Sequence, residues 1–340
     1  MKKTVYIVTG AAGHLGSTIV RELLAAGAEV RALLLPSETT EARPGLTVIR
    51  GNICDKDTLA PLFKRDSEDD MTVIHCAGIV TIYEKMNKKV YDVNVGGTKT
   101  LLAAAAAAGV KRFVYISSVH AIPTLPKGET MREVASFDPA GLRGCYAKTK
   151  AAASQAVLEM SKSGMETVIV HPSGIIGPFG LENGNVARMM MSYVRGRFHV
   201  AAEGGFDFVD VRDVAHGAIL AAERGRNGEC YLLTNRYITL RELFGTLSRV
   251  SGVKPIRTFL PMWFAYAVSP LAELFYMMIR KPPLYTPYSM YTLSGNAMYS
   301  HEKATLELGY TTRPLDETLR DTVRWIRSGS KKAALKPAKA

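Results

Sequence analysis

The chain has 340 residues, 47% of them hydrophobic, and this composition excludes a largely disordered protein. Lys and Arg number 43 against 31 Asp and Glu, which gives a net charge of +12, and residues 331–340 carry four of these cations without any acid. The sequence has no zinc-finger spacing and no arginine-rich recognition run, so we expect no nucleic-acid partner.

Cysteine spacing bears on metal sites and on cellular location. The four cysteines lie far apart with no CxxC pair, which argues against a metal site and against a disulfide framework. We therefore expect no bound metal and a cytoplasmic protein.

The apolar run after Lys2 and Lys3 lasts only about five residues before Gly10, too short for a signal peptide, and we interpret it as a first strand.

Short β-branched runs alternate with helical patterns through the first half of the chain. We expect strands at residues 4–8, 28–35, 46–50, 72–76 and 112–117. Such alternation is typical of parallel strands joined by crossover helices. We expect Gly27 to end the first helix and Gly109 to end the alanine-rich one.

The first strand runs directly into a loop with glycines at three-residue intervals, Gly10, Gly13 and Gly16. The first glycine permits a tight turn, the second lets the backbone approach a pyrophosphate, and the third allows close helix packing. Free amide groups at a helix start hold negative charge. The loop therefore predicts a dinucleotide site, which includes His14 and Leu15 between the glycines.

Tyr146 and Lys150 lie four residues apart in a segment that we expect to be helical, so their side chains project from one face. Reducing a ketone requires a proton for the developing alkoxide, and the reverse reaction requires a base for the alcohol. An ammonium group one helical turn away favours the phenolate. It is expected to lower the pKa of Tyr146 from about 10 toward neutrality.

The glycine loop and six later motifs resemble, in order, the extended short-chain dehydrogenase/reductase superfamily. The later motifs are GNICD at 51–55, HCAG at 75–78, NVGGT at 94–98, YISS at 115–118, YAKTK at 146–150 and HPSGIIGP at 171–178. The resemblance covers roughly residues 4–325. It implies an α/β fold, a Rossmann-type doubly wound parallel sheet with a smaller, mostly helical C-terminal substrate-binding region, and NAD or NADP as cofactor.

The resemblance also assigns cofactor-binding residues. It implies that Asn52 and Ile53 flank the adenine, that Ala77 and Gly78 line the inner edge of the cofactor, and that Pro172 lies beside the nicotinamide. Besides these residues, Lys150 is expected to bind the ribose hydroxyls, and Asn94 to support the cofactor side of the site.

The implied catalytic residues are Ser118, Tyr146 and Lys150. Ser118 is preferred over Ser117 because the family's pattern places the catalytic hydroxyl second in the pair. A hydrogen bond from this serine to the carbonyl oxygen stabilises charge where it develops.

We expect an NAD(P)-binding Rossmann domain at residues 1–173 and a substrate-binding region at 174–327, followed by a basic tail at 328–340. The two are interleaved, because a strand near 229–233 is expected to return to the sheet. Thr239 and Glu242 form a capping-box pattern at a helix start, and a last amphipathic helix is predicted from about Pro314 to Arg327.

The apolar segment 261–279 approaches the length of a membrane span. Because Ser269 and Pro270 interrupt it, we expect a kinked pair of helices that packs against substrate or core. Peripheral contact with a membrane surface stays open as the alternative.

Three activities of the superfamily are candidates for this chain: dehydration, sugar-nucleotide epimerisation, and the oxidoreduction of hydrophobic alcohols and ketones. Dehydratases place a Thr and acidic residues just after the serine, where this chain has residues 119–121, VHA. Sugar-nucleotide epimerases usually carry an Arg and an Asn where this chain has His171 and Gly174. The chain is more similar to the branch with 3β-hydroxysteroid dehydrogenases and dihydroflavonol reductases. A sugar-nucleotide epimerase and a non-catalytic NAD(P)-binding regulatory protein remain as alternatives.

A small hydrophobic substrate suits the later part of the chain, which is rich in Met and aromatic residues. The side chains that could line its pocket are Met189, Met190, Met191, Phe206, Trp263, Phe264, Tyr276, Met277 and Tyr288.

The choice between NAD and NADP stays open at this stage. NAD-preferring relatives end the second strand with an acid and NADP-preferring ones with an Arg, but this chain has Leu34 and Leu35 there. Arg31 could reach a phosphate only in a different strand register, and Glu38 could serve the ribose if the turn folds back. The resemblance also implies a homodimer through helices on the flank of the sheet.

Overall fold

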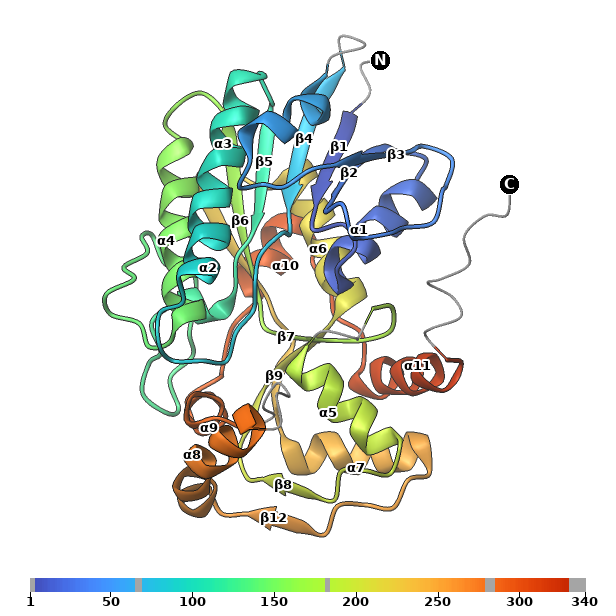
Figure 1. Ribbon diagram of the computed structural model, residues 1–340, viewed down its shortest axis with the longest axis vertical. Coiled ribbons are helices and arrows are strands. Elements are labelled where there is room, and N and C mark those ends of the chain that lie inside the picture. The colour runs from blue at the N-terminus through green and yellow to red at the C-terminus, as the bar shows by residue number, and fades with distance from the viewer. Residues whose placement is uncertain (1–3, 65–68, 181–183, 279–284, 330–340) are drawn as a thin grey trace.

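In the residues that the computed structural model describes, 4–64, 69–180, 184–278 and 285–329, the main sheet has seven parallel strands in the order β10-β6-β5-β4-β1-β2-β3 (Figure 1). They are β1 (Thr4–Thr9), β2 (Glu29–Leu34), β3 (Leu46–Arg50), β4 (Asp70–His75), β5 (Arg112–Ile116), β6 (Glu166–Pro172) and β10 (Glu229–Leu233). The five strands predicted in the first half are confirmed, each within two residues. The strand predicted near 229–233 pairs with β6.

Helices cover both faces of this sheet (Figure 1). One hydrophobic cluster joins the strands to α1 (His14–Ala25), α6 (Val211–Arg224) and α10 (Glu302–Leu308). The other joins them to α3 (Thr98–Ala107) and α4 (Cys145–Met160). Side chains along β1 alternate between the two, with Val5 and Ile7 in one cluster and Val8 in the other. The doubly wound α/β fold is thereby confirmed.

Apart from α6, β10 and α10, the elements after β6 build a smaller lobe below the carboxyl ends of the strands (Figure 1). Its strands are β7 (Gly174–Ile176), β8 (Val200–Ala202), β9 (Gly205–Asp210), β11 (Arg236–Thr239) and β12 (Thr258–Leu260). Its helices are α5 (Asn185–Val194), α7 (Leu240–Ser251), α8 (Met262–Met278), α9 (Pro287–Ser294) and α11 (Leu315–Arg327). The Thr239 side chain caps α7 by accepting a hydrogen bond from the Glu242 amide, as the capping-box pattern indicates.

The segment around Pro270 differs from its prediction, because α8 continues through the proline as one helix. Proline lacks the N–H that would bond the carbonyl of Tyr266 four residues earlier. The Ser269 hydroxyl donates to that carbonyl instead, at 3.0 Å. The predicted break is therefore wrong, since the neighbouring serine satisfies the freed acceptor.

Most of the surface of α8 is exposed and apolar. Only Ala265 and Ser269 are buried, whereas Trp263 and Met278 are 73% and 75% exposed. Within the described part of the chain, no helix combines the length and the apolar character needed to cross a membrane.

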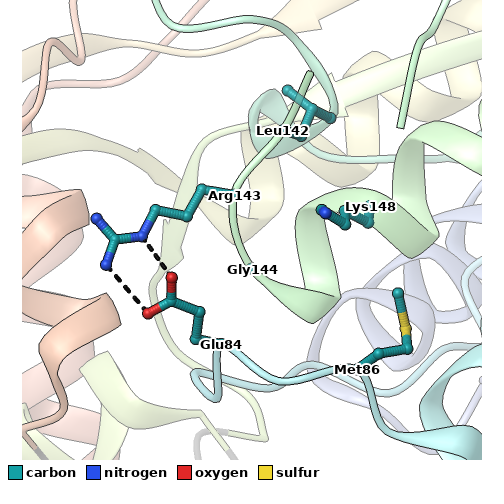
Figure 2. A pocket seen from close by; sticks show the side chains of 6 residues that line it. All are labelled: Glu84, Met86, Leu142, Arg143, Gly144 and Lys148. Atoms are coloured by element: carbon teal, nitrogen blue, oxygen red, sulfur yellow. Dashed lines mark hydrogen bonds and ion pairs between the residues drawn. The ribbon is translucent and has the colours of Figure 1, made fainter. Parts of the chain in front are cut away.

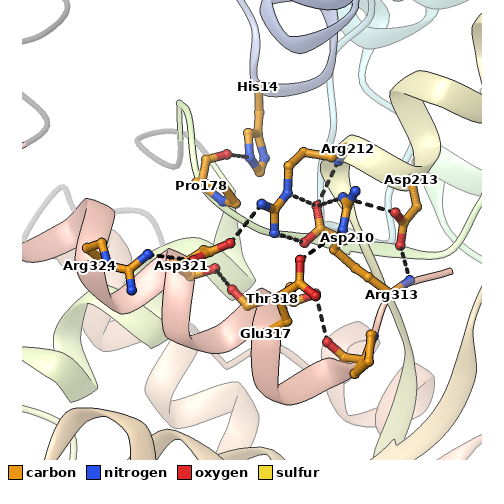
Figure 3. Close-up of polar contacts among 12 residues, drawn as sticks. His14, Pro178, Asp210, Arg212, Asp213, Arg313, Glu317, Thr318, Asp321 and Arg324 are labelled. Carbon is orange, nitrogen blue, oxygen red and sulfur yellow. Dashed lines mark hydrogen bonds and ion pairs between the residues drawn. The ribbon is translucent and has the colours of Figure 1, made fainter.

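A charge cluster holds α11 against the ends of β9 and α6 (Figure 3). The almost fully buried Asp210 accepts hydrogen bonds from Arg212 at 3.0 and 2.8 Å and pairs with Arg313 at 3.3 Å. Arg212 also pairs with Asp321 of α11 at 2.8 Å. The cluster therefore connects α11 of the smaller lobe to α6, which packs on the main sheet.

Candidate active site

The glycine loop follows β1 and leads into α1. Gly10 has a φ of +63°, and a Cβ there would lie 2.7 Å from the Ala77 nitrogen. A Cβ on Gly16 would lie only 2.2 Å from the Gly10 carbonyl oxygen. Gly13 precedes α1 and provides no side-chain cap for its first amides. A tight backbone cradle with amides at a helix start fits a pyrophosphate group.

We predict that Gly16→Ala raises the Kd for the dinucleotide at least tenfold, because the new methyl group displaces the Gly10 backbone. Gly245→Ala is the matched control, since a Cβ at Gly245 in α7 meets nothing within 4 Å. The control should bind cofactor like the wild type and gain up to about 1 kcal/mol of stability from the better helix former. Calorimetric titration with NAD and NADP measures both variants, and equal affinities contradict the predicted role.

His14 and Leu15 are the first two residues of α1. The Leu15 side chain is buried in the core. His14 Nε2 lies 2.8 Å from the Pro178 carbonyl oxygen, so the ring donates a hydrogen bond to the loop after β7 (Figure 3). Gly180 of that loop lies next to His14, and Arg21 stacks on Phe179 at 4.2 Å. The His14 ring thus holds residues 177–180 beside the start of α1.

The residues predicted to flank the adenine lie at the end of β3. Asn52 is exposed, and its Oδ1 accepts a hydrogen bond from the Cys54 amide at 3.0 Å. Ile53 is 5% exposed and packs against Gly97. Asn52 therefore remains the more accessible of the two predicted adenine contacts.

Asn94 supports the inner edge of the site through the backbone. It lies in a π-helical turn (Asp92–Gly97), accepts from the Ile79 amide at 2.7 Å and donates to the Ile79 carbonyl at 3.0 Å. It also donates to Thr149 at 3.1 Å, one residue before Lys150. Asn94 thus fixes the segment after Gly78 against α4, and π-helical turns are frequent at functional sites.

Tyr146 and Ser118 lie together at the carboxyl end of the sheet. A hydrogen bond with Ser118 lowers the pKa of the Tyr146 phenol, but burial acts first and raises this pKa to about 12. Ser117 is bonded to Ser154 at 2.7 Å inside the protein, away from Tyr146. Ser118 is therefore the serine that bonds Tyr146, and its catalytic role stays a prediction.

The buried Lys150 ammonium donates to the Ile116 carbonyl at 2.6 Å and to the Tyr115 hydroxyl at 3.2 Å. A Cβ on Gly78 would lie 3.6 Å from its Nζ, so the amine reaches the predicted cofactor edge. Burial lowers the pKa of Lys150 to about 8.

The expectation that Lys150 brings the pKa of Tyr146 toward neutrality is not met in the protein alone. The ammonium group bonds Tyr115 and Ile116, and no contact with the Tyr146 phenol is present among the described residues. Burial of the phenol therefore dominates, and its pKa moves upward. The role of Lys150 in binding the ribose stays a prediction.

Pro172 ends β6 beside two buried polar groups. His171 Nδ1 donates to the Ser118 carbonyl at 2.9 Å, and burial lowers the pKa of this imidazole to about 4. Ser173 donates to the carboxylate of Asp207, whose pKa burial raises to about 6. His171 thus fixes the backbone of Ser118, and Ser173 anchors the chain just after Pro172.

A pocket of about 220 Å³ opens at the start of α4, lined by Glu84, Met86, Leu142, Arg143, Gly144 and Lys148 (Figure 2). The Arg143–Glu84 ion pair, 2.7 Å long, forms one side of it. Tyr288 of α9 packs on Gly144, where a Cβ would lie 2.3 Å from its ring. The phenols of Tyr288 and Tyr146 are close enough for Tyr146 to raise the pKa of Tyr288, although burial raises it more.

Of the side chains expected to line the substrate pocket, the structure brings Phe206 and Tyr288 to the catalytic end. Phe206 stacks on His120, which in turn faces Tyr146. Met189 and Met190 belong to the core of the smaller lobe, and Met191 packs beside Ile326. Trp263, Phe264 and Met277 are exposed on α8.

The turn after β2 bears on the choice of cofactor. Glu38 Oε2 accepts a hydrogen bond from the Leu35 amide at 2.8 Å, so the turn folds back as the ribose hypothesis requires. Arg50 donates to the Leu35 carbonyl at 3.0 Å. Arg31 donates to the Leu62 carbonyl at 3.0 Å and to that of Lys64, so it is bound away from this turn.

We predict that Glu38→Gln raises the ratio of kcat/KM with NADP to that with NAD about fivefold. Removing a carboxylate near the ribose relieves about 1 kcal/mol of repulsion of the additional phosphate. Gln keeps an oxygen for the Leu35 amide. Glu41→Gln is the control, because Glu41 is exposed in the same loop and pairs with Arg43. An unchanged ratio in Glu38→Gln contradicts the predicted position.

The sequence assigned no site role to Tyr115 or His120. It also did not indicate that the His171 imidazole supports Ser118. His120 stands two residues after Ser118, so its position in the sequence was an available signal. The contacts of Tyr115 with Lys150 and of His171 with Ser118 join residues 35 and 53 positions apart. No local pattern indicates such contacts.

Comparison with known proteins agrees with this geometry. The family described as the NAD dependent epimerase/dehydratase family matches residues 6–234. The chain is 31% identical to sterol demethylase protein B of Methylococcus capsulatus, covering 94% of this chain and 98% of that protein. It is 29% identical to a putative dihydroflavonol 4-reductase of Synechocystis, covering 95% and 94%. The crystal structure of gox2253 superposes with a TM-score of 0.82 at 31% identity, over 95% and 98% of the two chains.

Proposed function

The chain belongs to the NAD dependent epimerase/dehydratase family, and from this premise we propose that it interconverts an alcohol and a ketone on a hydrophobic, steroid- or flavonoid-like substrate. When bound, the dinucleotide supplies the hydride donor or acceptor. Tyr146 gives or takes the proton of the reacting oxygen, and Ser118 holds that oxygen. The observation that carries the proposal is the hydrogen bond between Tyr146 and Ser118, with the buried Lys150 one helical turn further along α4.

An apolar substrate is supported by the surroundings of Tyr146. The His120 ring meets the Tyr146 ring edge-on, and Phe206 stacks on His120. Tyr288 lies close enough for Tyr146 to raise its pKa. Aromatic walls with few polar groups are typical of pockets for hydrophobic ligands. The names of two relatives, a sterol demethylase protein and a putative dihydroflavonol reductase, agree with this class of substrate.

Sugar-nucleotide epimerisation is the second candidate, and two positions disfavour it. His171 is buried with a lowered pKa, so it is neutral and unsuited to hold a phosphate. A Cβ on Gly174 would lie 2.8 Å from the Phe208 ring, so no longer side chain fits there without rearrangement. A non-catalytic regulatory role is disfavoured because Ser118, Tyr146 and Lys150 are all present.

A substrate panel tests the proposal. Hydroxysteroids, ketosteroids, flavanonols and UDP-sugars are each incubated with NAD or NADP, or with the reduced forms. Turnover is followed by absorbance of the reduced nicotinamide, and sugar products are separated by chromatography. We expect turnover of a steroid or a flavanonol. Reaction confined to UDP-sugars contradicts the proposal and favours the epimerase.

Peripheral membrane contact through residues 261–279 and a homodimer both stay predictions. The exposed apolar side chains of α8 are compatible with membrane contact, whereas the homodimer is predicted through helices on the flank of the sheet. Residue 279 lies outside the described residues, as do residues 330–340 of the predicted basic tail.

A further inference from the structure

His120 lies in the one-turn helix that directly follows Ser118. This turn covers Val119–Ala121, and the Ser118 hydroxyl accepts a hydrogen bond from the His120 amide at 3.3 Å. Val119 and Ala121 are each 1% exposed, whereas His120 is only partly buried. This hydrogen bond fixes the backbone of the turn to Ser118, a predicted catalytic residue. His120 is the least buried residue of the turn.

The His120 ring lies between two aromatic side chains of the substrate end. It stacks on Phe206 with ring centroids 5.4 Å apart and an angle of 21° between the planes. It meets the Tyr146 ring edge-on at 6.2 Å and 73°. These two contacts hold the imidazole beside the phenol that is proposed to transfer the proton.

The polar edge of this ring has no partner in the protein. Across the described ranges, no group hydrogen-bonds to either ring nitrogen of His120. Burial lowers the pKa of this imidazole to about 4, so at neutral pH one nitrogen is a donor and the other an acceptor. Because His120 is only partly buried and lies beside Tyr146, its ring nitrogens are available to bond a ligand in the site.

We propose that His120 binds substrate by donating a hydrogen bond to a second oxygen, carried by the carbon next to the reacting one. The reacting oxygen is already assigned to Tyr146 and Ser118. The 6.2 Å between the two ring centroids lets each side chain bond its own oxygen when these sit on adjacent carbons. This inference rests on the proposed function and narrows its substrates to hydrophobic ketones and alcohols with a neighbouring hydroxyl or carbonyl group.

Matched substrates and His120 variants test the inference. A flavanonol and its flavanone differ only in the hydroxyl next to the ketone, and 4-hydroxy and unsubstituted 3-ketosteroids form a second pair. For the pair that the wild type reduces, we expect kcat/KM to be about tenfold higher with the additional hydroxyl. His120→Phe keeps an aromatic ring against Phe206 but has no donor, so the preference should fall to within twofold. His120→Gln restores a donor and should recover part of it.

Controls separate this role from a structural one. His216→Phe changes an exposed histidine of α6 and should retain the full preference. The His120→Phe variant should have the same Tm and cofactor Kd as the wild type. If His120→Phe does not fold, His120→Leu is used in its place. A wild type without the preference, or a donor-free variant that retains it, overturns the inference. If the wild type reduces none of these ketones and acts only on UDP-sugars, the proposed function itself fails.

Discussion

Replacing Tyr146 with Phe is expected to lower kcat/KM by about 10²- to 10⁴-fold, the usual contribution of a positioned general acid or base. The variant loses only the phenolic hydroxyl. The glycine loop and the bonds of Lys150 to Tyr115 and Ile116 stay intact, so cofactor affinity should not change. Steady-state rates and a cofactor titration measure the two effects separately.

Tyr237→Phe is the matched control for this prediction. Tyr237 lies on β11 and is 38% exposed, so removal of its hydroxyl should leave the rate unchanged. If Tyr146→Phe turns over substrate as fast as this control, another group transfers the proton and the proposed mechanism is wrong.

The raised pKa of Tyr146 also predicts how the wild-type rate depends on pH. Oxidation of an alcohol requires the phenolate, which is scarce below a pKa of about 12. The oxidation rate should therefore increase between pH 7 and pH 9, whereas reduction uses the protonated phenol and should not increase. An oxidation rate that falls over this range, while the protein stays folded, contradicts Tyr146 as the base.

Replacing Arg212 with Met is expected to reduce the free energy of unfolding by about 3 kcal/mol, because it takes the main partner from the buried carboxylate of Asp210. Burial is the largest influence and by itself raises the pKa of Asp210. The hydrogen bonds and charge of Arg212, together with a hydrogen bond from Thr318, keep this pKa below its ordinary value. Urea unfolding followed by circular dichroism measures the loss.

Arg324→Met provides the comparison, since Arg324 pairs with the same Asp321 of α11 that Arg212 contacts (Figure 3). Arg324 is 71% exposed in its side chain, and exposed ion pairs contribute at most about 1 kcal/mol. Equal destabilisation by the two substitutions indicates that burial of Asp210 does not determine the effect.

Much of the fold and part of the site could be predicted from the sequence because they depend on local patterns. The β-branched runs indicate strands through their own residues, whatever they later pack against. The positions of Gly10 and Gly16 follow from steric limits within one loop. The spacing of Tyr146 and Lys150 places both on one helix face, since a helix repeats every 3.6 residues. Each of these features is encoded within about twenty residues.

Tertiary packing decided what those residues contact and how they ionise. Lys150 is bonded to Tyr115 and Ile116, so burial sets the pKa of Tyr146. Asp210 is stabilised by Arg313, 103 residues later.

Periodicity and spacing along the chain thus determined the sheet, the glycine loop and the placement of Tyr146 and Lys150 on one helix. The tertiary structure alone placed His120 between Phe206 and Tyr146 and assigned each buried charge its partner. The physical reason is that backbone conformation responds to neighbouring residues, whereas desolvation and hydrogen bonding depend on segments far apart in sequence.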